Sequence, residues 1–211
     1  MQLLLIRHGQ SQANIDHIIQ DDHDPLTDLG RQQADSLGRH LAASREITHL
    51  YSSPLARARE TAEIIGRHIG LDPVFEPGLA EINAGTAAGM TWDAWTEAYP
   101  EIAARLRSAE RSLDDRWEGG ESGHEFVARV YAAYDHIVGQ HLGTDDVVAA
   151  VSHGGALAWI ASRLHGDPDD VWPYERAVFG NASVSEILID EDGSHTIGAW
   201  NQTDHLTVEL R

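Results

Sequence analysis

Three short segments of this sequence place an arginine or a histidine directly after an apolar stretch. They are Arg7-His8-Gly9, the run around Arg57, and Ser152-His153-Gly154-Gly155. An imidazole with a pKa near its ordinary value of roughly 6.5 can attack phosphorus. Guanidinium groups bind phosphate oxygens through paired N–H donors, and glycines let the backbone approach an anion closely. Together these residue types predict phosphoryl transfer, with a second imidazole available to stabilise the transferred group.

Phosphoryl transfer from an ester also needs a proton for the departing oxygen. A carboxylic acid suits that task. Glu81 lies in Gly78-Leu79-Ala80-Glu81-Ile82, just after another short apolar segment. We therefore expect Glu81 to reach the same site.

The elements that position these residues alternate between strand and helix. The apolar patterns predict strands over 3–6, 49–52, 73–76 and 147–151, and helices over 27–43, 55–69, 123–142 and 155–164. A turn at Glu191-Asp192-Gly193 predicts a hairpin of 184–189 with 196–200. This order is typical of an α/β protein, a three-layer α/β/α sandwich around a mostly parallel sheet. Ligands bind such sheets at the carboxyl ends of the strands, where all four chemical segments fall.

Residues 84–120 break the alternation. They contain several glycines together with Trp92, Trp95, Tyr99 and Trp117. We expect one domain over residues 1–211, with a small helical cap insertion at about 84–120 over one end of the sheet. The tryptophans either line a pocket under this cap or pack against the sheet.

Composition restricts the partners. The 211 residues carry a formal net charge of −19, which argues against nucleic acid and anionic membranes as ligands. Cysteine is absent, so a thiolate nucleophile or a cysteine zinc site is excluded. The apolar run at 3–6 is too short for a signal peptide or a membrane span, from which we expect a cytoplasmic protein. The sequence is compatible with a homodimer.

The four chemical segments resemble the motifs of the histidine phosphatase superfamily, in its phosphoglycerate mutase-like group. The resemblance rests on Arg7-His8-Gly9, on Arg57 in a Ser-Pro-Leu-x-Arg-Ala motif, on His153 in a Ser-His-Gly-Gly motif, and on Leu79-x-Glu81. It implies that His8 becomes a phosphohistidine, that Arg7, Arg57 and His153 bind the phosphoryl group, and that Glu81 is the acid. It also places Asn14, Gln20 and the backbone of Gly154 against the phosphate or the rest of the substrate. The resemblance implies no metal and no cofactor.

Departures from the family pattern favour a phosphatase over a mutase. Ile18 falls where many members carry a basic residue that touches an anionic substrate. Four arginines lie in or near the insertion but do not form the mutase pattern: Arg105, Arg107, Arg111 and Arg116. The first hypothesis is a metal-independent phosphatase that hydrolyses a small phosphorylated metabolite through a phosphohistidine. The alternative is a cofactor-dependent phosphoglycerate mutase. A third, a non-catalytic protein that binds a phosphorylated ligand, is disfavoured by the intact His8, Glu81 and His153.

The thirteen histidines raise the question of a metal site. His17 and His23 are six residues apart, and His136 and His141 are five apart, so neither pair lies on one helical face. The sequence therefore predicts no metal site. Asp21, Asp22 and Asp24 lack the spacing of a calcium loop, and we expect them to form a solvated acidic rim that repels further negative charge on a substrate.

Overall fold

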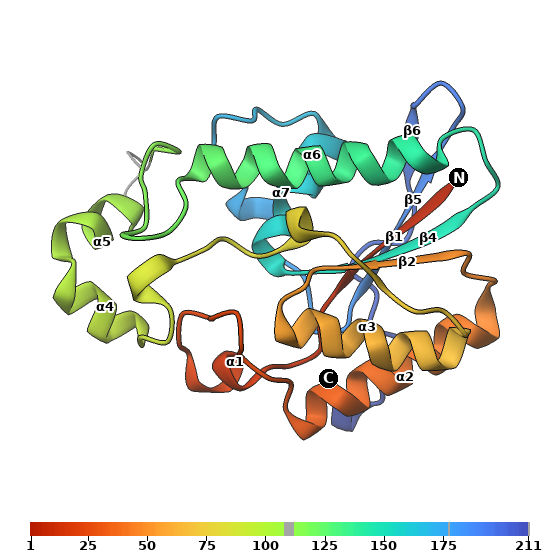
Figure 1. The fold of residues 1–211 in the computed structure, drawn as a ribbon, viewed down its shortest axis with the longest axis horizontal. Coiled ribbons are helices and arrows are strands. Elements are labelled where there is room, and N and C mark those ends of the chain that lie inside the picture. The colour runs from red at the N-terminus through yellow and green to blue at the C-terminus, as the bar shows by residue number, and fades with distance from the viewer. Residues whose placement is uncertain (108–111, 177, 211) are drawn as a thin grey trace.

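The protein, described here from a computed structural model, is built on one six-stranded sheet in the order β3-β2-β4-β1-β5-β6 (Figure 1). The structure describes residues 1–107, 112–176 and 178–210. The strands are β1 (Gln2–Arg7), β2 (His49–Ser52), β3 (Val74–Phe75), β4 (Val147–Ser152), β5 (Val184–Ile189) and β6 (His195–Ile197). Strands β1 to β4 are parallel, and β5 and β6 add an antiparallel edge. The predicted mostly parallel sheet with an edge hairpin is confirmed.

Helices cover both faces of the sheet. Their bounds are α1 (Gln12–Asp16), α2 (Asp28–Ser44), α3 (Ala56–Ile69), α4 (Trp92–Ala98), α5 (Pro100–Arg107), α6 (Gly123–His141) and α7 (Gly154–His165), with short 3-10 turns at Pro77–Leu79, Gly85–Ala87, Tyr174–Arg176 and Val208–Leu210. Thr27 caps α2 by accepting a hydrogen bond from Gly30 N at 3.0 Å, as its residue type predicts. Helix α1 was not predicted, because five residues are too few to show a helical period.

Alternation along the strands explains the three layers. Leu3 and Leu5 of β1 join the core that contains Phe126 of α6 and Trp159 of α7. The intervening residues, Leu4 and Ile6, join a second core with α2 and α3 on the opposite face. Because both faces are buried, β1 and β4 read as unbroken apolar runs. The α/β/α sandwich is confirmed.

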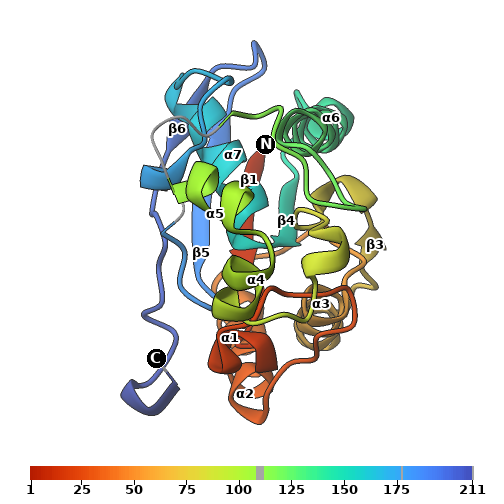
Figure 2. The same cartoon turned by 90° about the vertical axis from the view of Figure 1, so that its left-hand side faces the viewer.

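The segment 84–120 extends beyond the carboxyl ends of the parallel strands. Its helices α4 and α5 lie apart from the three layers (Figures 1 and 2). Trp95 and Trp117 form a small core there with Ile19. Backbone hydrogen bonds from Ile19 N to Met90 O, at 2.9 Å, and from Gly89 N to Ile19 O, at 2.8 Å, tie this segment to the loop after α1. The two segments thus enclose space over the sheet edge.

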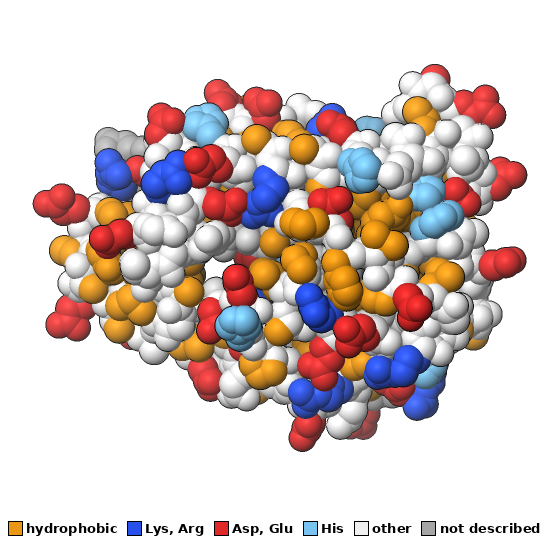
Figure 3. Space-filling model, viewed as in Figure 1, with side chains coloured by type: hydrophobic (Ala, Val, Ile, Leu, Met, Phe, Trp, Pro, Cys, Tyr) orange, Lys and Arg blue, Asp and Glu red, His pale blue; other side chains and the backbone are white. Residues whose placement is uncertain are grey.

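Acidic side chains are scattered over the surface, in keeping with the net charge of −19 (Figure 3). The face in view is hollowed where the lobe of α4 and α5 meets the rest of the molecule (Figure 3). Among the helices that the structure describes, none combines the length and the apolar character needed to cross a lipid bilayer.

Candidate active site

The sheet order brings the two predicted catalytic histidines together. Strand β4 lies between β1 and β2, and Arg7 pairs in register with Ser152. His8 and His153 each follow directly after these positions, so both leave the sheet at the same edge. Their ring centroids lie 5.1 Å apart.

His8 is held in the protonation state that a nucleophile needs. Its side chain is buried, and Nδ1 lies 2.7 Å from the carbonyl oxygen of Gly9. A carbonyl only accepts, so the imidazole proton sits on Nδ1 and the lone pair is on Nε2. Burial, followed by the charges of Arg57 and Arg7, holds the pKa of His8 well below its usual value. The imidazole is therefore neutral near pH 7.

His153 is also neutral and is oriented by a serine. Its Nε2 lies 2.8 Å from Ser53 Oγ, which already accepts a hydrogen bond from Leu55 N. A Ser53 hydroxyl that donates to Nε2 leaves the imidazole proton on Nδ1. Burial, then Arg57, lowers the pKa of His153 well below its usual value. His153 also precedes the N-terminus of α7, where the helix dipole favours an anion.

Three buried donors converge on this edge without a protein partner among the described residues. They are Arg7 Nε, Arg57 Nε and His153 Nδ1. The guanidinium groups are fixed at their other nitrogens, because Arg57 donates to Asp21 O at 2.7 Å and Arg7 donates to Phe179 O. Burial lowers the pKa of both arginines, and the charge of Glu81 opposes that shift. Buried polar groups without partners are rare, and three beside one nucleophile form a cage suited to a phosphoryl group.

Glu81 is positioned by backbone donors. Gly155 N donates to Glu81 Oε2 at 2.8 Å, and Ile82 N donates to Oε1 at 3.0 Å. A Cβ on residue 155 would overlap the Glu81 carboxylate, which explains a glycine at that position. The hydrogen bond from Gly155 places the carboxylate at the N-terminus of α7, next to His153.

Arg129 holds the Glu81 loop from the opposite side. Its guanidinium donates to the carbonyl oxygens of Gly78, Ala80 and Glu81, at 2.9 to 3.2 Å, and to the carboxylate of Glu121. Arg129 was not predicted from the sequence, because an arginine inside a helix carries no motif of its own. Ser53 was also missed as a partner of His153, although it stands in the recognised Ser-Pro-Leu-x-Arg-Ala motif.

Two glycines of the motifs differ in the space that a side chain would have at their positions. A Cβ on Gly9 would overlap the backbone of Gly30, so this glycine is needed for the packing of the loop against α2. A Cβ on Gly154 would meet Arg7 Nε only at 3.9 Å, an ordinary contact. Gly154 is the first residue of α7, and its N–H is one of the donors that the helix leaves without an intrahelical partner.

A cavity of about 390 Å³ opens beside Glu81 and Gly155. Its described wall is mainly apolar: Ala13, Ile18, Ile19, Ile82, Ala84, Trp92 and Trp117. The polar lining residues are Asn14, His17, Gln20 and Glu81, with no arginine or lysine among the described residues that line it. Trp92 and Trp117 line the cavity, as the first alternative predicts. Trp95 is buried in the small core of the insertion and does not pack against the sheet, so the second alternative is wrong for it.

Asn14 and Gln20 line this cavity, but both also hold the loop together. Asn14 Oδ1 accepts hydrogen bonds from Ser11 N and Asn181 Nδ2, which leaves its amide nitrogen as the donor for an anion. Gln20 Nε2 donates to Ser11 Oγ at 2.8 Å, which leaves its carbonyl oxygen for a ligand.

The expectation that Asp24 belongs to a solvated rim is wrong. Asp24 is buried, and its Oδ1 accepts a hydrogen bond from Ala13 N at 3.0 Å. Its carboxylate satisfies the backbone at the start of α1, a demand that only the folded loop creates. Asp21 and Asp22 are exposed, as expected.

Neither Arg105 nor Arg116 lines the cavity. Arg105 pairs with Asp115 at 2.5 Å, and Arg116 pairs with Glu125. Arg111 and the side chain of Arg107 lie outside the described residues.

The chain is similar to known proteins over most of its length. The model of the histidine phosphatase superfamily (branch 1) matches residues 3–203. The chain is 37% identical over 192 residues to a probable phosphoglycerate mutase, GpmB, of Salmonella choleraesuis (strain SC-B67), covering 90% of this chain and 86% of that one.

Solved structures include two similar phosphatases. One is a putative alpha-ribazole-5'-P phosphatase from Escherichia coli, with a TM-score of 0.83 and 25% identity over 96% of this chain and 97% of that one. The other is a mycobacterial glucosyl-3-phosphoglycerate phosphatase in complex with VO3, with a TM-score of 0.78 and 27% identity over 95% and 98% of the two chains.

Proposed function

This chain belongs to the histidine phosphatase superfamily, and from that premise we propose that it is a phosphatase that hydrolyses a small phosphorylated metabolite through a phosphohistidine at His8. The observation that carries the proposal is the cage of three partnerless buried donors beside the neutral His8. A dianionic phosphoryl group supplies the acceptors that these donors lack. No step of the proposed reaction needs a metal ion or a cofactor.

In the first step, the lone pair of His8 Nε2 attacks phosphorus and forms a nitrogen–phosphorus bond. The bond from phosphorus to the ester oxygen breaks, and that oxygen takes a proton from the carboxyl group of Glu81. Arg7, Arg57 and His153 stabilise the charge on the transferred group without moving, because each is already fixed by other contacts.

In the second step, water cleaves the phosphohistidine. Glu81, now a carboxylate, takes a proton from this water, whose oxygen bonds to phosphorus as the nitrogen–phosphorus bond breaks. Inorganic phosphate leaves, and His8 returns to its starting form. Arg129 is a positioning residue in this scheme, since it contacts the Glu81 loop and not the reacting atoms.

The cavity supports an alcohol portion that carries little charge. Its described wall is apolar and aromatic around Asn14 and Gln20, and it offers no guanidinium or ammonium group to a second anion. An anionic tail would lose its hydration there without gaining a guanidinium or ammonium partner among the described lining residues. We propose that the segment 84–120 caps this alcohol portion, with Trp92 and Trp117 against it.

The second candidate is a phosphoglycerate mutase, favoured by the 37% identity to GpmB. It shares the first step but returns the phosphoryl group from His8 to the bound glycerate. The two candidates differ in product. With 3-phosphoglycerate as substrate, a phosphatase releases inorganic phosphate, whereas a mutase accumulates 2-phosphoglycerate.

The test of the proposed function is to trap the intermediate and identify the product. We expect quenching in alkaline denaturant, during turnover of p-nitrophenyl phosphate labelled in its phosphoryl group, to yield a label on His8 that is stable in alkali and lost on later acid treatment. Inorganic phosphate should appear in proportion to p-nitrophenol. A label on another residue, or turnover without a label in rapid-quench experiments, would refute the mechanism.

A further inference from the structure

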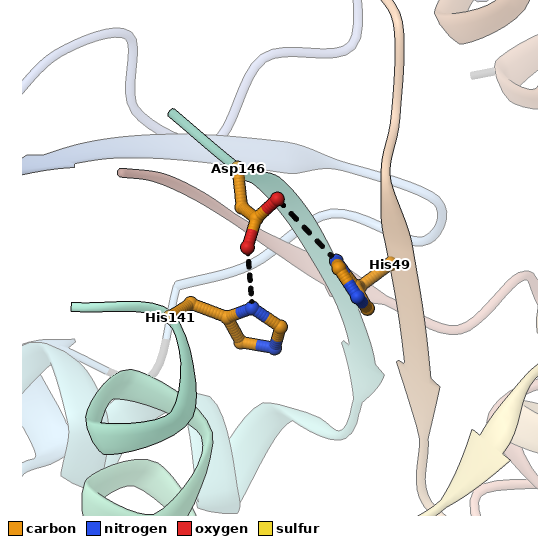
Figure 4. A group of neighbouring side chains, drawn as sticks. All are labelled: His49, His141 and Asp146. Carbon is orange, nitrogen blue, oxygen red and sulfur yellow. Dashed lines mark hydrogen bonds and ion pairs between the residues drawn. The ribbon is translucent and has the colours of Figure 1, made fainter. Parts of the chain in front are cut away.

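A second group of histidines lies at the opposite end of the sheet. His49 is the first residue of β2, His141 is the last residue of α6, and Asp146 directly precedes β4. Figure 4 shows both imidazole rings turned toward the Asp146 carboxylate. Six strand residues separate Asp146 from His153, so this cluster is roughly 20 Å from the catalytic cage.

The separations within the cluster suit a small metal ion. His141 Nδ1 lies 2.8 Å from Asp146 Oδ2, and His49 Nδ1 lies 3.8 Å from Asp146 Oδ1. All three ligand atoms lie within 4.8 Å of one another. Ligands at about 2.05 Å around a tetrahedral zinc ion are roughly 3.3 Å apart. The separation of His141 Nδ1 from Oδ2 is about 0.5 Å shorter than this value, and His49 would move toward the oxygen that His141 faces. The His49 side chain is 45% exposed, which lets it make this adjustment.

The hydrogen bonds of His141 prepare one ring nitrogen for a cation. The Tyr51 hydroxyl donates to Gln140 Oε1 at 2.9 Å, so its oxygen is left to accept from His141 Nε2 at 3.0 Å. Gln140 Nε2 faces His136 Nε2 at 3.1 Å, which fits this amide orientation. In the metal-free protein the 2.8 Å contact between His141 Nδ1 and Asp146 Oδ2 is a hydrogen bond. A metal ion would take the place of the proton in this contact, while Tyr51 keeps the other ring nitrogen fixed.

We propose that His49, His141 and Asp146 bind a divalent transition-metal ion, with zinc the best fit to two imidazoles and one carboxylate. Calcium and magnesium prefer all-oxygen sites, so they do not match this donor set. A fourth ligand would come from solvent on the exposed His49 side. Tyr51 acts as the outer partner that fixes the ligating ring of His141. The contact of His49 Nδ1 with the Thr48 hydroxyl, at 3.0 Å, would be replaced by the metal bond.

The expected role of this ion is structural. It would join the end of α6 to the starts of β2 and β4, three elements that are distant in sequence. Binding to the folded state alone raises its stability by mass action. The proposal is independent of the proposed phosphatase activity, since no ligand belongs to the catalytic cage.

The test is calorimetric titration of the chelator-treated full-length protein with zinc chloride. We expect one zinc ion per chain, with the affinity lowered at least about tenfold in His49→Ala and in Asp146→Asn. The matched control is His124→Gln, which removes a half-exposed histidine that faces a single carboxylate, Asp114, at 3.4 Å. This control should keep the wild-type affinity. Equal affinity in the cluster variants, or no stoichiometric binding, would overturn the proposal.

Because a variant that fails to fold would also lose zinc binding, a second measurement locates the ion in the folded wild-type protein. Crystals soaked in zinc chloride should show anomalous scattering between His49, His141 and Asp146, and a peak only at the catalytic cage would count against the site. Tyr51→Phe keeps the ring and removes the hydroxyl that orients His141. We expect this variant to fold and to bind zinc about tenfold more weakly.

Discussion

The two ends of the sheet each gather two imidazoles and one carboxylate, yet they suit ligands of opposite charge. At the carboxyl end, His8 and His153 are buried beside Arg7 and Arg57, and the carboxylate of Glu81 is bound by backbone N–H groups. At the amino end, the carboxylate of Asp146 faces both His141 and His49 directly. The difference teaches that neighbours, and not the histidines themselves, decide between an anion site and a cation site.

The charge states of the ionisable groups also differ between the two ends of the sheet. At the carboxyl end, burial and two guanidinium charges hold the pKa values of both histidines well below the usual range. The imidazoles stay neutral, and the positive charge is left for a phosphate. At the amino end, the hydrogen bond from His141 lowers the pKa of Asp146, so its carboxylate stays charged. A negative carboxylate between two imidazoles favours a cation.

The largest expected effect separates the two ends by activity. His8→Ala removes the proposed nucleophile and should lower kcat/KM for p-nitrophenyl phosphate by at least about 10⁴-fold. His49→Ala should leave the same rate unchanged. Steady-state kinetics on both purified variants checks this, and near-normal turnover by His8→Ala would reverse the assignment of the catalytic end.

Glu81→Gln should show a loss that depends on the leaving group. Phenyl phosphate needs a proton on its departing oxygen, so its turnover should fall by about 10²–10³-fold. The leaving group of p-nitrophenyl phosphate, p-nitrophenolate, is a stable anion, so phosphorylation of His8 by this substrate should fall by less than about tenfold. The burst of p-nitrophenol and the two steady-state rates measure this contrast. An equal loss in the rate of His8 phosphorylation by the two substrates would contradict an acid role for Glu81.

Ile18→Arg should move the substrate preference toward a second anion. Ile18 lines the cavity, and a guanidinium there would pair with the carboxylate of 3-phosphoglycerate. We expect kcat/KM for that substrate to rise about tenfold, since a hydrogen bond to a charged group contributes about 1.5–3 kcal/mol before solvent screening. Ile18→Gln, of similar length without charge, is the control and should give no such gain.

The pH dependence should reflect the neutral imidazoles of the carboxyl end. Because the pKa of His8 is lowered, protonation of His8 should not reduce kcat/KM as the pH falls through about 6.5. The phosphate monoester itself ionises near pH 6, so the profile is first corrected for the ionisation of the substrate. The acid limb should begin only below about pH 6.5. A pH–rate profile checks this, and a limb at or above pH 6.5 that belongs to His8 would contradict it.

The lowered pKa values of His8 and His153 should also make the stability of the fold depend on pH. Unfolded histidines bind protons near pH 6.5, whereas folded His8 and His153 do not. Acidification below about 6.5 therefore favours the unfolded chain and lowers the free energy of unfolding. Thermal melts from pH 7.5 to 5.5 should show this trend, weakened in His8→Ala.

The smallest expected effect is at the amino end. Asp146→Asn and His49→Ala should keep kcat/KM within about twofold of wild type, with or without zinc, because roughly 20 Å separates the cluster from His8. Zinc should raise the melting temperature of the wild type and not of these variants. A change in activity that follows zinc occupancy would show that the two ends are coupled.

The sequence by itself determined where the proposed catalytic residues lie in the fold. These residues directly follow apolar strands, and parallel strands align their carboxyl ends, so adjacency in sequence became adjacency in space. The same alternation of apolar residues determined the three layers, since β1 sends Leu3 and Leu4 to opposite faces. The family motifs added the roles of His8, Glu81 and His153, which stay predictions until the variants are measured.

Only the tertiary structure decided the rest. Asp24 became a buried acceptor because the folded loop needs a partner for Ala13 N, and Arg129 reached the Glu81 loop from a helix far along the chain. Spacing along the sequence gave no sign of the cluster at the amino end, where His49 and His141 meet from different elements. Pairing across a sheet depends on strand order, and strand order depends on the packing of the whole domain. Functional residues that directly follow a single strand could therefore be predicted from the sequence. Clusters formed by side chains of distant elements could not.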